Sequence, residues 1–318
     1  WLRYSKILEE VAAAREAEKW ALMDSVYPLA KEVERVMRDP TSAENKAAIA
    51  ADEAYLAAAN DRASALYRYG YYPHNIHFLL VGAQMAGLAD EALYAAAMLA
   101  EVTSDEVSGD LAWVQAIDTA PYAAHAQLAS ADEILALPDP GDRFPFVKGH
   151  WHWARGTAFA LQGDLTAALA EQQAIEAIIA TADLAGLEEQ YLPARDVLGI
   201  AKHLVEARIA QASEDWHATE HHLEEAILLE DGIAYMEPPY WSYPVRQTLG
   251  AVRLQAGDVA GAIQAFEGAL ATHPNNAWAL WGIWQARTAE EDAAAAEAAK
   301  DAFEKAWLGQ EMPSLDRL

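Results

Sequence analysis

Residues 243–276 decide the fold, and they read YPVRQTLGAVRLQAGDVAGAIQAFEGALATHPNN. Two runs of helix-forming residues flank a short turn, so the stretch predicts a pair of antiparallel helices. Gly250 and Ala262 are small, which suits the place where the two helices cross, because a larger side chain there would push them apart. Phe266 is expected to fill the contact with the next pair, and Pro274 is expected to end the second helix.

The same pattern recurs along the chain with lower fidelity. Gly87, Gly163 and Gly257 lie in turns that interrupt helical runs, and a second helical run follows each turn. In the register of the first stretch, copies begin at residues 73, 116, 149, 200, 243 and 275. No run alternates apolar and polar residues for long enough to form a strand. The sequence therefore predicts an all-α fold, a right-handed α-α superhelix of stacked helical hairpins.

The 243–276 pattern resembles the tetratricopeptide repeat (TPR), an antiparallel helix pair of 34 residues. Three segments also resemble a family of uncharacterised bacterial TPR proteins: NKAAIAADEAY at 45–55, YYPHNIHF at 71–78 and MEPPYWSYPVRQ at 236–247. The likeness covers about residues 45–290. It implies a TPR-like helical-hairpin solenoid, and it carries no activity that transfers to this chain.

The expected organisation has three parts. Residues 1–60 are expected to form N-terminal helices, residues 61–310 the TPR-like helical repeat array, and residues 311–318 a C-terminal tail. The first residues contain neither a start methionine nor a signal peptide, so we expect the natural N-terminus to be missing. The expected protein is soluble, and the choice between cytoplasm and periplasm stays open.

Charge and composition exclude several classes of partner. The 318 residues contain 22 Lys and Arg against 49 Asp and Glu, a formal charge of −27. Nucleic-acid binding is excluded because it depends mainly on Lys and Arg contacts to phosphates, and an anionic membrane surface is disfavoured for the same reason. No run approaches 18 consecutive apolar residues, which argues against membrane insertion. The absence of cysteine removes disulfides, thiolate metal sites and cysteine nucleophiles.

One histidine motif has a known chemical counterpart. His217 and His221, with Glu220 between them, fit the H-x-x-E-H pattern of inverted zinc proteases. In the repeat register, however, they lie in the second helix of a hairpin whose packing side is supplied by Leu223 and Ala226. The favoured interpretation is therefore an exposed outer face. A zinc site at His217 and His221 is kept as an alternative, although it needs a third ligand from another helix.

A second group of histidines falls on the predicted concave wall. His74 and His77 are three residues apart on one side of a helix, and His150 and Trp153 take the same positions in a later hairpin. Ordinary groove-lining or hydrogen-bonded core histidines are the favoured interpretation, and a zinc or copper site at His74 and His77 is the alternative. An intervening hairpin is expected to place the two helix axes roughly 16–20 Å apart, too far for His150 to share one metal.

The third group is aromatic and lies before the strongest repeat. Tyr240 and Trp241 follow two prolines and precede Arg246 and Gln247. Such aromatic and arginine side chains are enriched at binding hot spots, so these four residues are candidates for a binding surface. Of the two alternatives, the favoured one is that large aromatic side chains fill wide gaps where the connection between hairpins is long.

These observations favour a non-catalytic binding or scaffold protein. Its concave helical groove is expected to take a peptide, a protein partner or a small ligand. No nucleotide-binding glycine motif or nucleophile elbow occurs, so the chain is expected not to be an enzyme. The alternatives are a metal-binding protein or enzyme that uses the groove histidines, and a structural subunit that buries its aromatic surfaces by oligomerisation. No cofactor is expected apart from zinc or copper.

Overall fold

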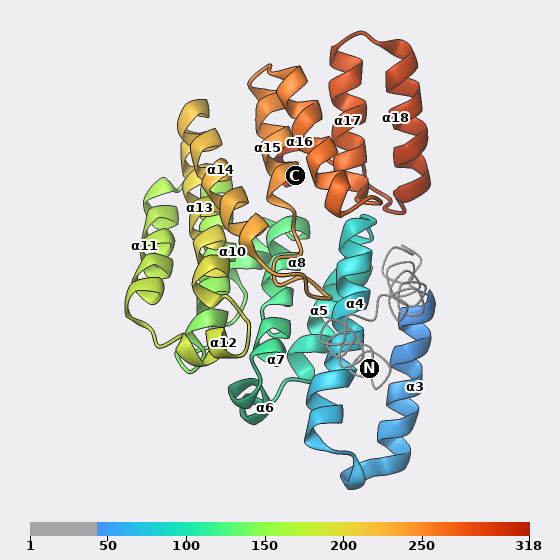
Figure 1. Ribbon diagram of the computed structural model, residues 1–318, viewed down its shortest axis with the longest axis vertical. Helices are drawn as coiled ribbons and strands as arrows, with labels where there is room; N and C mark the ends of the chain where they lie inside the picture. The colour runs from blue at the N-terminus through green and yellow to red at the C-terminus, as the bar shows by residue number, and fades with distance from the viewer. Residues whose placement is uncertain (1–42) are drawn as a thin grey trace, which may run out of the picture.

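The computed structural model describes residues 43–318, and most of the N-terminal helices expected over residues 1–60 lie outside this range. Of the described residues, 76% are helical and none forms a strand, which confirms the all-α prediction (Figure 1). None of the helices between residues 43 and 318 is both long enough and apolar enough to cross a bilayer.

The helices follow one another mostly with short connections, and the two long ones are residues 136–144 and 233–244. A short π-helix, Tyr67–Tyr71, leads directly into α4. The helices are α3 Ala43–Ala59, α4 Tyr72–Met85, α5 Ala89–Glu101, α6 Asp105–Asp110, α7 Ala112–Ile117, α8 Ala120–Leu128, α9 Ala131–Leu135, α10 Pro145–Leu161, α11 Leu165–Thr181, α12 Ala185–Glu189, α13 Ala194–Ala212, α14 Trp216–Gly232, α15 Val245–Gln255, α16 Val259–Thr272, α17 Ala277–Ala289 and α18 Ala293–Ala306.

Most of these helices pack as neighbouring pairs. The pairs are α4 with α5, α10 with α11, α13 with α14, α15 with α16, and α17 with α18 (Figure 1). The weak copy expected from residue 116 forms the short helices α8 and α9. Ser130 begins α9 with a reciprocal capping box to Glu133, and α9 ends at Leu135, before Pro138. The helical pairing follows the predicted turns.

Four hairpin turns share one construction. A residue with positive φ is followed by an aspartate whose side chain accepts a hydrogen bond from the backbone N–H three residues later, which caps the second helix. The aspartates are Asp164, Asp215, Asp258 and Asp292. The residues with positive φ are Gly163, Glu214, Gly257 and Glu291.

The predicted role of Phe266 is confirmed. Its ring is fully buried between the glycines of two successive first helices, Gly250 of α15 and Gly282 of α17. A Cβ built on Gly250 would lie 2.6 Å from the ring, so only glycine leaves room for it. The second helix, α16, ends at Thr272, two residues before Pro274. This hairpin therefore has the register that its sequence predicts.

The hairpins at the two ends of the described chain touch each other. The indole nitrogen of Trp278 in α17 donates a hydrogen bond to the carbonyl of Gln84 in α4, at 2.8 Å. The backbone N–H of Leu308 donates to the carbonyl of Ala86, at 2.9 Å. An open array, in which each hairpin contacts only its neighbours, would not make these contacts.

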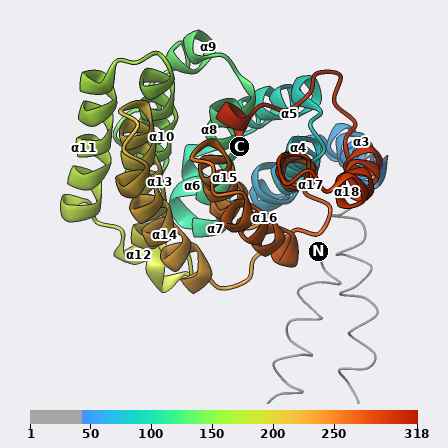
Figure 2. The ribbon, with the colours of Figure 1, turned by 90° about the horizontal axis from the view of Figure 1, so that it is seen from above.

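The expected C-terminal tail, residues 311–318, is packed into the molecule. Leu318 is fully buried, and its carbonyl accepts a hydrogen bond from Arg208 of α13 at 2.8 Å. The neighbouring Arg317 donates to the carbonyl of Ala129 and accepts from the hydroxyl of Tyr243. Seen from above, the C-terminus lies beside α8 and α15 (Figure 2). These contacts join the C-terminal residues to α13, to the end of α8 and to the connection before α15.

Candidate functional site

A large cavity formed by the described residues lies beside α4. Its volume is about 370 Å³. One wall is the C-terminal half of α4, residues 81–86, and the opposite wall is the end of α14 and the connection 233–244 to α15. Residues 269–276, at the end of α16, complete the lining. Figure 1 shows the connection between α14 and α15 crossing towards α4, which brings these distant segments together.

Apolar side chains supply most of the cavity wall. They come from α4 and from the connection, and they include Val81, Met85, Ile233, Met236 and Trp241. Gly82 adds to the space, because no heavy atom of the described residues lies within 4 Å of a Cβ built there. A wall of this kind favours the apolar body of a ligand.

Charged side chains lie at one side of the cavity. Arg246 and Asp231 form two parallel hydrogen bonds, each 2.7 Å long, which lower the pKa of the Asp231 carboxyl. The carboxyl of Glu230 lies beside this pair and accepts the backbone N–H of Val245 at 3.3 Å. Burial raises the pKa of Glu230 to about 7. The cavity lining therefore includes a half-buried carboxyl, that of Glu230, which changes charge near neutral pH.

The four residues predicted as a candidate binding surface, Tyr240, Trp241, Arg246 and Gln247, do not all face the same space. Trp241 and Arg246 both line the cavity. Tyr240 and Gln247 do not line it, and Gln247 is buried, where its amide oxygen accepts a hydrogen bond of 2.6 Å from Asn276. Most of Trp241 is buried as well, against the ring of Trp153, with the ring centroids 4.7 Å apart. This packing matches the gap-filling alternative for the connection.

The predicted groove residues of α4 and α10 meet in the interior. His77 and His150 both line a small cavity of about 10 Å³ under Tyr240 and Trp241. We expected an intervening hairpin to keep α4 and α10 too far apart for this. That prediction was wrong, because the helices between them, α7, α8 and α9, are short. Trp153 is only 3% exposed. The structure thus brings these residues together as buried side chains.

Burial keeps these histidines neutral. It lowers the pKa of His77 to about 3 and the pKa values of His74 and His150 to about 4. His74 lies edge-on to the rings of Phe78 and Trp113. Among the described residues, no third His, Asp or Glu joins His74 and His77 in a group that could hold a metal.

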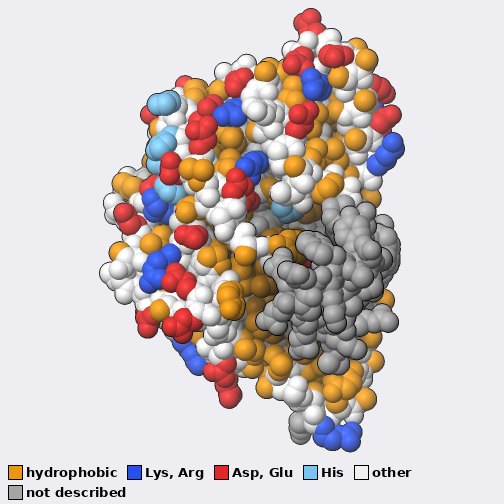
Figure 3. All heavy atoms as spheres, in the orientation of Figure 1, with side chains coloured by type: hydrophobic (Ala, Val, Ile, Leu, Met, Phe, Trp, Pro, Cys, Tyr) orange, Lys and Arg blue, Asp and Glu red, His pale blue; other side chains and the backbone are white. Residues whose placement is uncertain are grey.

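The histidines of α14 point in different directions. His217 and His221 are exposed, as the outer-face interpretation predicts, and Leu223 and Ala226 are fully buried on the packing side. His222 is half-buried and turns towards α13. Figure 3 shows several histidine side chains gathered at the upper left, over α13 and α14.

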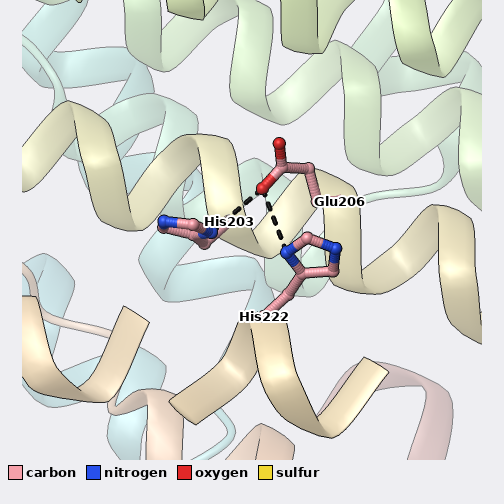
Figure 4. Close-up of side chains that lie close together, drawn as sticks. All are labelled: His203, Glu206 and His222. Atoms are coloured by element: carbon pink, nitrogen blue, oxygen red, sulfur yellow. Dashed lines mark ion pairs between the residues drawn. The ribbon is translucent and has the colours of Figure 1, made fainter. Parts of the chain in front are cut away.

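One group of side chains in the described residues has the geometry of a metal site. His203 and Glu206 of α13 and His222 of α14 offer three ligand atoms that all lie within 4.8 Å of one another. The Nδ1 atoms of His203 and His222 lie 2.9 and 3.1 Å from the same carboxylate oxygen, Oε2 of Glu206 (Figure 4). Our sequence interpretation missed this group, although His203 and Glu206 have the one-turn spacing of ligand pairs on a helix.

Comparison with known proteins gives no relative from which a function can be transferred. No protein-family model matches the chain, and no curated protein or solved structure matches it either. What these sites can bind therefore follows from their own residues, distances and charges.

Proposed function

We propose that this chain is a non-catalytic binding protein that takes a small ligand in the cavity beside α4. The observation that carries the proposal is the cavity itself. Its volume of about 370 Å³ falls within the range of small-molecule sites, roughly 300–1,000 Å³, and its wall is mainly apolar with a few polar groups at one side. The TPR-like relationship and the right-handed superhelix are part of the same proposal. In that superhelix, α17 and the residues after α18 contact the end of α4, as described above.

The charged side of the cavity favours a ligand with an amine. Both terminal nitrogens of Arg246 are already bound to Asp231, so that pair is neutral as a unit. The cavity lining also includes Glu237 and the carboxyl of Glu230, which has a pKa of about 7. An ammonium group beside it would stabilise its ionised form, whereas a ligand carboxylate would be repelled. The proposed ligand therefore combines an apolar body with a cationic amine.

Two matched probes test this ligand chemistry. We expect 3-phenylpropylamine to bind more tightly than 3-phenylpropionate in isothermal titration calorimetry at pH 8, because Glu230 is then largely ionised. The variant Glu230→Gln removes this charge and should weaken the preference, with Glu237 still in the lining. Equal affinity of the two probes for the natural sequence would contradict the proposed ligand class.

A steric variant tests the location. Gly82→Phe places a ring in the open space of the cavity and should abolish binding of the amine. Gly186→Phe is the matched control, since Gly186 is exposed in α12, does not line the cavity and also has no described heavy atom within 4 Å of a built Cβ. Retained binding in Gly82→Phe, or no binding of either probe to the natural sequence, would overturn the proposed site.

A further inference from the structure

We infer that His203, Glu206 and His222 form a binding site for Zn²⁺ between α13 and α14. None of the three residues lines the cavity beside α4, so this inference is independent of the proposed ligand. Their side chains converge from two packed helices (Figure 4). They are 19%, 19% and 27% exposed, which leaves the site accessible from solvent.

The spacing of the donor atoms suits a tetrahedral ion. Zinc bonds of about 2.0–2.2 Å place two ligand atoms of a tetrahedron roughly 3.3–3.6 Å apart. The two imidazole nitrogens lie 2.9 and 3.1 Å from Oε2 of Glu206, and no pair of ligand atoms is more than 4.8 Å apart. Small rotations of the side chains therefore bring all three atoms into a zinc coordination shell.

The two imidazole nitrogens have unused binding capacity. Nδ1 of His203 and Nδ1 of His222 are buried, and each approaches Oε2 of Glu206 without the alignment of a good hydrogen bond. Poorly aligned contacts of this kind stabilise buried nitrogens only weakly, and a metal ion would bind both nitrogens together with the carboxylate. Two imidazoles and a carboxylate suit zinc and similar transition metals better than calcium or magnesium, which prefer oxygen ligands.

Two neighbouring side chains, Gln172 and Lys202, contact the carboxylate of Glu206. Nε2 of Gln172 in α11 donates a hydrogen bond of 2.8 Å to Oε1 of Glu206, which leaves Oε2 facing the two histidines. The ammonium of Lys202 lies 3.2 Å from both oxygens of Glu206. Gln172 therefore acts as a positioning residue of the kind that supports metal ligands, and Lys202 competes with the ion for the carboxylate.

A titration of the metal-free protein with Zn²⁺ tests the site. We expect one ion per chain by isothermal titration calorimetry, and affinity at least tenfold weaker in His203→Ala and in His222→Ala. The matched control is the double variant His217→Ala/His221→Ala, which removes two exposed histidines of the same helix and should leave the affinity unchanged. No stoichiometric uptake, or a loss of uptake in the control, would overturn the inference.

Two further variants distinguish a metal site from a merely structural cluster. Gln172→Leu should weaken zinc binding about tenfold, in line with other supporting residues. Lys202→Met should tighten it, because the competing cation is gone. Titration with Co²⁺ should produce the visible absorption of a tetrahedral ion in the natural sequence and not in His222→Ala. Tighter binding in Gln172→Leu, or weaker binding in Lys202→Met, would contradict the assigned roles.

Discussion

Among single residues, His150 shows how burial changes the chemistry of a side chain. Its Nδ1 donates a hydrogen bond of 2.9 Å to the carbonyl of Phe146, one turn earlier in α10. Burial lowers the pKa of His150 to about 4, against about 6.5 for an unfolded chain. Between these two values the unfolded chain binds a proton that the folded chain does not bind. The free energy of unfolding therefore falls as the pH drops from about 6.5 towards 4.

The variant His150→Asn should remove this contribution. The amide of asparagine can donate to Phe146 in place of Nδ1, and it does not titrate. We expect the natural sequence to lose on the order of 2 kcal/mol more stability than the variant between pH 7.5 and pH 5. Urea denaturation at the two pH values measures the difference. Parallel losses would show that His150 is not the group responsible, since all other titrating groups are shared.

At the scale of elements, the four hairpin turns each contain a residue whose backbone conformation is strained unless that residue is glycine. The residue before each capping aspartate has positive φ, a conformation that glycine adopts without strain and other residues adopt at about 1–2 kcal/mol. Two turns use glycine there, whereas Glu214 has φ of 57° and Glu291 has φ of 59°. The capping hydrogen bonds of Asp215 and Asp292 compensate for this strain.

Replacing these glutamates should stabilise the fold. We expect Glu214→Gly and Glu291→Gly each to raise the free energy of unfolding by about 1 kcal/mol, because the strain of positive φ disappears. Gly163→Glu, in the turn between α10 and α11, is the converse variant and should lower it by a similar amount. Urea denaturation of the three variants checks both directions. A destabilised Glu291→Gly would mean that its side chain contributes more than its backbone strain costs.

At the scale of the whole molecule, the first and last described hairpins meet at the end of α4, next to residues that line the cavity. Gly87, in the turn after α4, has φ of 76° and lies directly under the indole ring of Trp307. Trp307 in turn packs edge-on against Trp278, with ring centroids 5.0 Å apart. This contact holds α17 against the end of α4, beside the cavity wall.

Paired glycine variants measure this closure. Gly87→Ala and Gly257→Ala both put a Cβ on a residue with positive φ, but only at Gly87 does the Cβ collide with a described side chain, that of Trp307. We therefore expect Gly87→Ala to cost about 1–3 kcal/mol more than Gly257→Ala. In a Trp307→Ala background the two costs should become equal. Equal costs in the natural sequence, by thermal or urea denaturation, would show that the ring of Trp307 moves aside freely.

The sequence by itself determined the features that depend on near neighbours. Helix propensity, the turn glycines, the capping aspartates and the small residues at crossings act over one hairpin or its neighbour. The helical pairs and the contact of Phe266 with the next hairpin, at Gly282, were therefore predictable from spacing alone. The excess of acidic residues, with its net charge of −27, needs no structure to be recognised. The outward direction of His217 and His221 also followed from the local register.

Only the tertiary structure decided where the candidate sites are. The cavity joins Val81 and Gly82 of α4 to Arg246 and the connection before it, segments far apart in the chain. The metal ligands are found on facing surfaces of α13 and α14, where the rotation of one helix against the other selects His222 instead of its neighbour His221. Linear spacing describes one helix at a time. Which faces meet depends on the packing of the whole chain, and bulky rings such as Trp307 set that packing over distances that no local pattern encodes.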